Sequence, residues 1–313
     1  MTQVTVAAYS TGVKMNNEVI AMSSDTRAVA PSKDANGNKG INNCTSDNGS
    51  PVPTILELAK AAGKSVGAVT TTELTHATPA ATYSHICHRD AAYAIAEQAV
   101  PGGAGFNQAL GDGVDVLMGG GANHWTPYSA NNKGGRADGR DLTAELTARG
   151  YRYVTTKDEL SAVNSGKVLG LFSTKSHLDY ELDRVAKGAA STQPSLSEMT
   201  AKAIDLLSQN SQGYFLMVEG GRIDHALHAT NAKRSLTDAV ALDEAVKTAL
   251  GKVDLSDTLI VVTADHDHTM TINGYSAKGN KVLDLVKNAD GSTQNDADGK
   301  PFTTLVFGNG PNR

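Results

Sequence analysis

The chain has 313 residues, 28 basic and 33 acidic side chains, and a formal net charge of −5. It carries no basic run that would favour nucleic-acid binding, and no apolar stretch reaches the roughly 18 residues that span a bilayer. The length supports a large buried core, so we expect one domain over residues 1–313. Met1 opens on a polar stretch, which is not the pattern of a signal peptide. Cys44 and Cys87 are the two cysteines, and the sequence leaves open whether they pair.

The first part of the chain predicts short strands and helices in alternation. Turn-forming residues mark the loops, and a glycine at position 63 marks the end of a helix. In chain order we expect a strand at 19–23, a loop at 31–51, a helix at 54–62, a strand at 65–71, a helix at 80–99 and a strand at 114–118.

Residues 120–140 are rich in Gly, Asn and Asp, contain the single Trp, and predict a surface insertion. Beyond them, Ser195 and Glu198 form a capping-box pattern at the start of a helix. Helices that alternate with buried strands favour an α/β fold, a three-layer α/β/α sandwich with a mainly parallel central sheet. In this part we expect a helix at 195–210, a strand at 214–218, a helix at about 230–250, a strand at 258–263 and a loop at 274–300.

Two of the predicted strands end in clusters of carboxylates and imidazoles. A lone Asp–His pair is more often a surface or capping feature than a metal site. Two such clusters after buried strands favour divalent metal sites at the carboxyl edge of one sheet, because Zn²⁺ accepts both ligand types. The first cluster is Glu219, Asp224, His225 and His228, and the second is Asp265, His266 and His268.

Four motifs in order along the chain resemble those of the bacterial alkaline phosphatase family. An ordered set of motifs is far more specific than any one of them. The motifs are Ala8-Tyr-Ser-Thr-Gly-Val-Lys14, His76-Ala-Thr-Pro-Ala-Ala followed by Arg89, Val218-Glu-Gly-x-x-Ile-Asp-x-x-x-His228, and Thr263-Ala-Asp-His-x-His268.

The resemblance implies a metal-dependent hydrolase that cleaves phosphate monoesters through a phospho-enzyme intermediate. The implied cofactors are two Zn²⁺ ions and one Mg²⁺ ion, and the implied ligands are small phosphate monoesters and inorganic phosphate. Family members are commonly homodimers, and they are mostly periplasmic or secreted. We therefore expect the same assembly and location for this protein, without a membrane span and without nucleic-acid binding.

The resemblance also implies which residues hold the metal ions. Thr78 alone would be an ordinary helix N-cap before Pro79, and that role is compatible with metal ligation. Thr78 and Glu219 are expected to supply oxygens to a magnesium ion, or to another metal at that site. The implied ligands are Asp224 and His228 for the leaving-group zinc, Asp265 and His266 for the zinc at the nucleophile, and Glu219 and Thr78 for magnesium.

Four further residues are implied around these ligands. Arg89 would bind two phosphate oxygens at once, a task that suits its planar guanidinium. His76 and His225 occupy positions where the family varies and where histidine is associated with an altered preference at the third metal. His268 would orient a zinc ligand without binding the ion.

The chain departs from the family pattern at both ends. Counting back from Lys14, the nucleophilic serine of the family falls on Thr2 and the neighbouring aspartate falls on Met1. A His-Ser-Gly-Glu-Asp segment would follow Gly308 in the family and is absent here. We therefore expect an interior piece of a phosphatase, incomplete at both ends, in which the Thr2 hydroxyl takes the place of the serine.

Two alternatives remain open from the sequence. The chain is either an active phosphomonoesterase or a truncated or degenerate fragment that binds metal and catalyses nothing. A phosphodiesterase or a sulfatase of the same superfamily is a third interpretation, which Arg89 and the motif at residues 76–81 disfavour.

Overall fold

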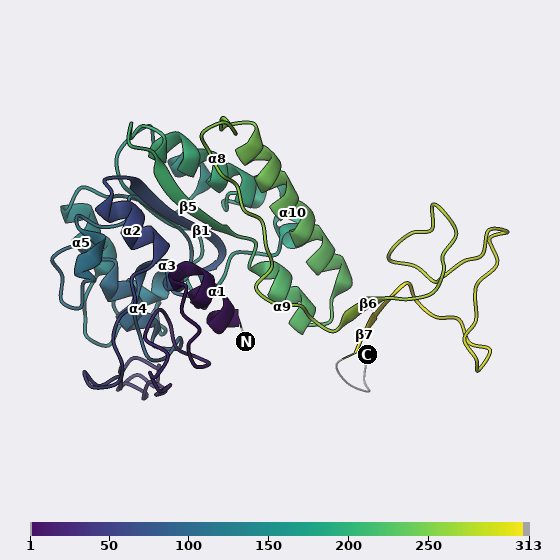
Figure 1. Cartoon of the computed structure of the whole chain (residues 1–313), viewed down its shortest axis with the longest axis horizontal. Coiled ribbons are helices and arrows are strands. Elements are labelled where there is room, and N and C mark those ends of the chain that lie inside the picture. The colour runs from purple at the N-terminus through teal and green to yellow at the C-terminus, as the bar shows by residue number, and fades with distance from the viewer. Residues whose placement is uncertain (1, 309–313) are drawn as a thin grey trace.

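The computed structural model describes residues 2–308, with the side chains of residues 5–308. Its centre is a five-stranded parallel sheet in the order β3-β4-β2-β1-β5, and a two-stranded antiparallel hairpin, β6–β7, lies apart from it (Figure 1). The strands are β1 (Ser65–Glu73), β2 (Val116–Gly120), β3 (Arg152–Val154), β4 (Val168–Leu171), β5 (Tyr214–Glu219), β6 (Met270–Ile272) and β7 (Leu305–Phe307).

Helices cover both faces of the sheet, as the alternation in the sequence predicts. Among the described helices, none combines the length and the apolar character needed to cross a bilayer. The helices are α1 (Thr2–Thr11), α2 (Ile55–Ala61), α3 (Ala77–Tyr83), α4 (Ala92–Gln98), α5 (Leu142–Ala148), α6 (Lys157–Ser161), α7 (Glu181–Ala186), α8 (Leu196–Leu207), α9 (Arg222–His228) and α10 (Ala232–Leu250).

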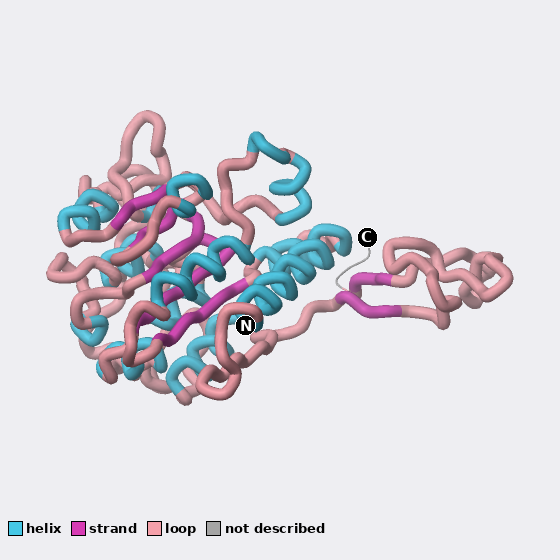
Figure 2. Tube along the Cα trace, turned by 90° about the horizontal axis from the view of Figure 1, so that it is seen from above, coloured by secondary structure: helices cyan, strands magenta, loops and turns pink. Residues whose placement is uncertain are grey.

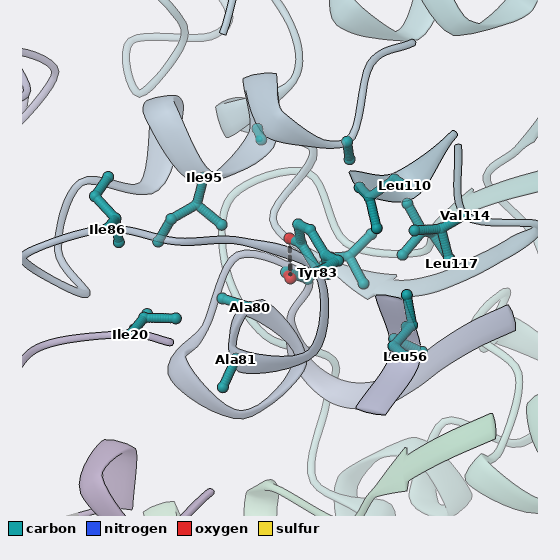
Figure 3. Close-up of a cluster of buried hydrophobic side chains, with 14 of the residues drawn as sticks. Ile20, Leu56, Ala80, Ala81, Tyr83, Ile86, Ile95, Leu110, Val114 and Leu117 are labelled. Atoms are coloured by element: carbon teal, nitrogen blue, oxygen red, sulfur yellow. Dashed lines mark hydrogen bonds between the residues drawn. The ribbon is translucent and has the colours of Figure 1, made fainter. Parts of the chain in front are cut away.

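The strand β1 separates two hydrophobic clusters. Its side chains alternate, so Val66 and Ala68 pack with α1 to α5 while Val69 packs with α8. In the first cluster, Tyr83 lies among apolar side chains such as Leu56, and its hydroxyl donates to the Leu74 carbonyl oxygen at 2.8 Å (Figure 3). The side-chain alternation of a buried parallel strand thus fixes which helix lies on which face.

Several predicted elements are confirmed. The helix α8 begins after the Ser195 cap, and the Ser195 hydroxyl and the Glu198 carboxylate form the reciprocal capping box. The helix α2 ends before Gly63, whose φ of +76° suits a residue without a Cβ. The strands β1, β2 and β5, the helix α10 and the loops at 31–51 and 274–300 also lie where we expected them, within a few residues.

The predicted helix at 80–99 is wrong, because the structure breaks it into α3 and α4. The chain turns extended at Ser84 and pairs Ile86 with Ile20 in an isolated antiparallel bridge. That bridge is also what the predicted strand at 19–23 becomes, together with a second bridge from Met22 to Pro51. Alanine content alone gave no sign of this interruption, which depends on pairing with residues far along the chain.

The predicted strand at 258–263 is also wrong. These residues form no ladder, and Leu259, Val261 and Val262 are 86%, 74% and 61% exposed. In the described part of the chain, β5 is the edge of the sheet, and nothing pairs with its outer side. An apolar run becomes a buried strand only when a neighbouring strand accepts its hydrogen bonds, and none does so here.

Beyond α10 the chain crosses the body and then projects away from it as an arm. The hairpin β6–β7 forms the base of this arm, and residues 273–304 form its looped outer part (Figures 1 and 2). Within the segment 120–140, by contrast, the Trp125 side chain is fully buried in the first hydrophobic cluster, so this segment is anchored in the core.

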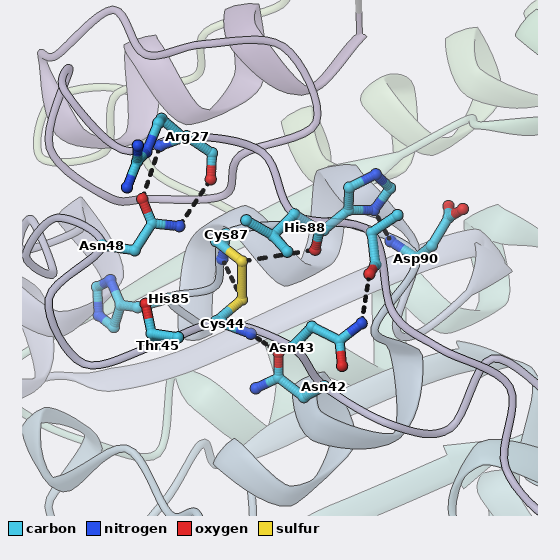
Figure 4. Close-up of a disulfide and its surroundings, with 12 residues drawn as sticks. Arg27, Asn42, Asn43, Cys44, Thr45, Asn48, His85, Cys87, His88 and Asp90 are labelled. Atoms are coloured by element: carbon cyan, nitrogen blue, oxygen red, sulfur yellow. Dashed lines mark hydrogen bonds between the residues drawn. A yellow bond between two sulfur atoms is a disulfide. The ribbon is translucent and has the colours of Figure 1, made fainter.

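A disulfide joins Cys44 to Cys87 and settles the pairing that the sequence left open (Figure 4). It ties the loop at 31–51 to the segment between α3 and α4, two residues before Arg89. Asn48 attaches the same loop to the segment before it, because its side chain exchanges two hydrogen bonds with the Arg27 backbone.

Candidate functional site

The predicted site residues gather at the carboxyl edge of the parallel sheet. Glu219 is the last residue of β5, and Asp224 lies on α9 directly after it. Thr78 lies in the first turn of α3, just beyond the end of β1. Loops that follow parallel strands meet at one edge, which is why residues about 140 positions apart along the chain come together here.

Asp224 is the centre of an imidazole cluster. Its Oδ1 atom lies 2.6 Å from Nε2 of His268, 3.5 Å from Nε2 of His228 and 3.6 Å from Nε2 of His266. Asp224, His228 and His268 each offer a ligand atom, and the three atoms lie within 4.8 Å of one another. One carboxylate oxygen therefore faces three ring nitrogens from two distant segments of the chain.

Asp265 completes this cluster from the second segment. Its Oδ2 atom is buried without a hydrogen-bond partner among the described residues, 3.7 Å from Nε2 of His266. A buried carboxylate oxygen without a donor is costly unless a cation lies beside it. The donor set of Asp224, His228, Asp265 and His266 is the mixture of carboxylate and imidazole that zinc accepts, so these residues fit the expected ion.

Glu219 lies beside the cluster, held by the hydroxyls of β1. Thr70 Oγ1 donates to its Oε2 at 2.5 Å and Thr72 Oγ1 at 3.2 Å. Burial raises the pKa of Glu219, and hydrogen bonds from Thr70, Thr78 and Thr72 partly offset that rise. A site built from carboxylate and hydroxyl oxygens is one that Mg²⁺ prefers, so Glu219 and Thr78 fit the ion that the resemblance implies.

Arg89 approaches the same region from the segment between α3 and α4. Its Nη2 donates to Nε2 of His76 at 2.8 Å. Its charged neighbours are Glu18 and Asp90, and also Asp224 and Glu219 of the proposed metal-ligand cluster. Together with Glu18 and Asp90, Arg89 lines a cavity of about 520 Å³. Arg89 is therefore part of the cavity wall and also has the carboxylates of the cluster nearby.

Thr2 and Thr78 lie on two helices that pack against each other. Thr2 begins α1, which packs on α3, but its side chain lies outside the described part of the chain, so its role stays a prediction. Thr78 is not the helix N-cap that the sequence suggested as its ordinary role. The N-cap of α3 is His76, which makes no capping hydrogen bond with its side chain, and Thr78 is the second residue of the helix.

Comparison with known proteins agrees with this geometry. The family described as alkaline phosphatase matches residues 2–313. The chain belongs to the alkaline phosphatase family. It is 39% identical to the tissue-nonspecific alkaline phosphatase of Gallus gallus over 98% of this chain and 59% of that protein. It is 38% identical to an alkaline phosphatase of Gadus morhua, over 98% of this chain and 64% of that one.

Solved alkaline phosphatases share the fold. The crystal structure of the Thermus thermophilus alkaline phosphatase superimposes with a TM-score of 0.71 at 34% identity, over 88% of this chain and 50% of that one. The chain thus spans roughly 50% to 64% of these relatives. The membership confirms the expected family and the expected α/β fold.

Sequence reasoning missed one histidine of this candidate site. His177 has no motif around it, yet its ring centroid lies 5.4 Å from that of His76 and 4.2 Å from that of His225. Its Nδ1 accepts the backbone N–H of Glu73 at 2.9 Å. The position of His177 shortly after β4 is the only signal, and it is visible only once the sheet is known.

The rings of His76, His177 and His225 are neutral, and each of them already accepts a hydrogen bond with one ring nitrogen. Arginine and backbone N–H groups can only donate, so His76 accepts from Arg89, His177 from Glu73, and His225 from Arg222 at 2.8 Å. Burial is the largest cause that lowers the pKa of each ring, to about 3 for His177 and about 4 for His225. These rings therefore act here as acceptors that hold cations and N–H groups in place.

Proposed function

We propose that this chain hydrolyses phosphate monoesters in a metal-dependent reaction. The observation that supports this most directly is that Arg89 lines an open cavity and has Asp224 and Glu219 among its charged neighbours. A monoester has an anionic phosphoryl group that needs charge neutralisation on several oxygens, together with stabilisation of the leaving oxygen. Family membership supports the same reaction.

In this proposal, Arg89 binds two phosphoryl oxygens through its guanidinium, and His76 keeps that guanidinium in its orientation. When bound, two zinc ions and one magnesium ion supply positive charge to the phosphoryl and leaving oxygens. His268 holds the Asp224 carboxylate in position through its 2.6 Å hydrogen bond.

The proposed metal ligands are those implied by the family motifs. Asp224 and His228 would hold one zinc, Asp265 and His266 the other, and Glu219 with Thr78 the magnesium.

We further propose that Thr2 supplies the nucleophile and forms a phospho-enzyme. Its hydroxyl would attack phosphorus, and the alcohol would leave with a proton. Water would then release inorganic phosphate and restore the threonine. Placement matters here, because attack needs the hydroxyl within about 3–3.5 Å of phosphorus.

We propose a periplasmic or secreted location, which the Cys44–Cys87 disulfide supports, because such bonds persist in oxidising compartments. A homodimer is proposed from the family resemblance alone.

The test is p-nitrophenyl phosphate hydrolysis by the purified chain with zinc and magnesium, with a chelator, and as Thr2→Ala and Arg89→Ala variants. Turnover that the chelator abolishes and that both variants lose would support the proposal. Arg152→Ala is the matched control, because Arg152 is an exposed arginine on β3, outside the site. If folded protein binds zinc and shows no turnover, the chain is instead an inactive metal-binding fragment.

A further inference from the structure

Arg222 lies two residues before Asp224, and the proposed reaction does not use it. It is the first residue of α9, and its Nη1 atom lies 2.8 Å from Nδ1 of His225. Residues three positions apart share one face of a helix, so the guanidinium lies against the imidazole ring. A guanidinium can only donate, so Nδ1 of His225 accepts this hydrogen bond and the ring proton lies on Nε2.

Tyr180 holds the Arg222 side chain from the other side. The Cζ atom of Arg222 lies 3.7 Å from the centroid of the Tyr180 ring, which is a close cation–π contact. Asp238 and Asp179 are its acidic neighbours, but Arg222 makes no ion pair with any residue that the structure describes. Its Nε atom is buried without an acceptor among the same residues, which costs stability. The hydrogen bond to His225 is therefore the directed polar contact of this side chain.

The imidazole of His225 is enclosed on further sides. The ring of His177 lies 4.2 Å away at a tilt of 47°, and the ring of His76 lies 5.4 Å away and edge-on. No residue in the described ranges accepts the Nε2–H of His225. His76 itself accepts a hydrogen bond from Arg89. The ring with the unfilled donor thus neighbours the ring that orients Arg89.

We propose that Arg222 is a positioning residue that fixes His225 as an N–H donor, so that His225 donates from Nε2 to an oxyanion and does not bind a metal ion. The inference rests on the proposed function, which supplies that oxyanion as the phosphoryl group held by Arg89. An N–H group that reaches a phosphoryl oxygen adds a charge-assisted hydrogen bond to those of the guanidinium. Tyr180 acts indirectly, because it holds Arg222.

The same hydrogen bond makes His225 a poor metal ligand. A metal ion binds the lone pair of a neutral imidazole nitrogen, and the lone pair of His225 faces Arg222. A metal ion at Nε2 would move the ring proton to Nδ1, where it would point at an N–H of the guanidinium. His225 also belongs to neither of the two groups of described residues whose possible ligand atoms lie within 4.8 Å of one another.

NMR of protein labelled with nitrogen-15 in its histidines tests the tautomer without any assay of turnover. The His225 signals are those that the His225→Gln spectrum lacks. At pH 8, above the usual imidazole pKa of about 6.5, we expect the wild type to carry the proton on Nε2 and to keep it when zinc and magnesium are added. Arg222→Ala should populate both tautomers, because Nδ1 loses its donor. Arg222→Lys should restore the wild-type tautomer, because its ammonium group can donate.

Binding of inorganic phosphate to the metal-loaded protein measures the consequence. Arg222→Ala should raise the dissociation constant found by calorimetry about fivefold, because one hydrogen bond to the anion is no longer directed. Arg222→Lys should recover most of the affinity. Arg234→Ala is the matched control and should change nothing. Arg234 also lies over Tyr180, with its Cζ atom 4.7 Å from the ring centroid, but its side chain pairs with Asp183 and not with His225.

The tautomer and the phosphate constant can each overturn the inference. A wild-type proton on Nδ1, or the same tautomer in the wild type and in Arg222→Ala, would show that Arg222 does not position the ring. Loss of the Nε2 proton when metal is added would show that His225 is a metal ligand. Equal phosphate constants for these two proteins, or no phosphate binding, would contradict donation to an oxyanion.

Failure of the proposed function is a separate result. A chain that hydrolyses no monoester would refute that function, while the spectra and the phosphate constants would still decide the role of Arg222. If Arg222→Ala does not fold, Tyr180→Leu replaces it, because this change removes the ring that holds the guanidinium. Tyr180→Leu should then shift the tautomer in the same direction, and Tyr180→Phe, which keeps the ring, should not. Equal spectra for these two variants would overturn the inference.

Discussion

A neutral imidazole fixes the direction of Arg89. The guanidinium can only donate, so His76 must accept with Nε2 and keep its proton on Nδ1. Burial holds the pKa of His76 well below its usual value, so the ring stays an acceptor at neutral pH. The rings of His177 and His225 both lie edge-on to it at 5.4 Å and limit its rotation.

We predict that His76→Ala weakens phosphate binding by about tenfold, because Arg89 loses the acceptor that orients it. His76→Gln should recover part of the affinity, since its side-chain carbonyl can accept the same N–H. The inhibition constant of inorganic phosphate measures the effect. Equal constants for the alanine variant and the wild type would show that Arg89 is positioned by other contacts.

A second histidine makes stability depend on pH. His124 shares a 2.7 Å hydrogen bond with Thr75, and burial lowers its pKa to about 4. The unfolded chain binds a proton at this ring below about pH 6.5, while the folded chain does so only near pH 4. Stability is therefore lost as the pH falls from 6.5 to 4, by up to about 3 kcal/mol, because one pKa unit corresponds to about 1.4 kcal/mol.

Urea unfolding of the wild type and of His124→Gln at several pH values in this range checks the prediction. The difference between the two proteins should change with pH, because glutamine does not titrate. Parallel curves would mean that His124 contributes nothing to the acid sensitivity.

The helices and strands that have a clear local sequence pattern were predictable from the sequence. The helix α8 has a capping box and an apolar face, and β5 is a short apolar run before a polar cluster. The run at 258–263 is also a short apolar run before a polar cluster, as β5 is, yet it is not a strand. A strand needs a neighbouring strand to pair with, and the local sequence does not show whether one is present. The break between α3 and α4 has the same origin, since Ile20 pairs with Ile86 across 66 positions.

The Cys44–Cys87 bond closes a loop with a sequence separation of 43 residues. Replacing both cysteines with serine should lower the free energy of unfolding by about 3–4 kcal/mol, because the unfolded chain regains the entropy of that loop. Denaturant titration of the variant against the oxidised wild type measures the loss. Reduced wild type serves as the control and should match the variant, and a loss in only one of them would assign the effect to the substitution itself.

For the molecule as a whole, the ordered motifs predicted which distant segments converge, and the structure brings Asp224 into contact with His266 and His268. The sequence did not predict that Glu73 and His177 join the same region. Both depend on β1 and β4 lying in one sheet with a strand between them, which is a property of the complete topology. No local sequence pattern indicates which strands become neighbours in a sheet.

We expect bound zinc to stabilise the whole chain. Free metal at a hundred times its dissociation constant adds about 2.7 kcal/mol, so a chelator should lower the melting temperature by several degrees. Asp224→Asn should remove most of the difference between metal-loaded and chelated protein, because Asp224 is the hub of the cluster. Scanning calorimetry measures this without any assay of turnover, and an unchanged melting temperature on chelation would contradict it.

The uncovered run at 258–262 has a consequence for handling the protein. Its exposed Leu259, Val261 and Val262 belong to no ladder, and among the described residues the partly buried strand β5 has no partner on its outer side. Such segments act as templates for strands of other molecules, so the chain should self-associate as its concentration rises. Val261→Lys places a charge in the middle of the run and should raise the concentration at which light scattering first increases.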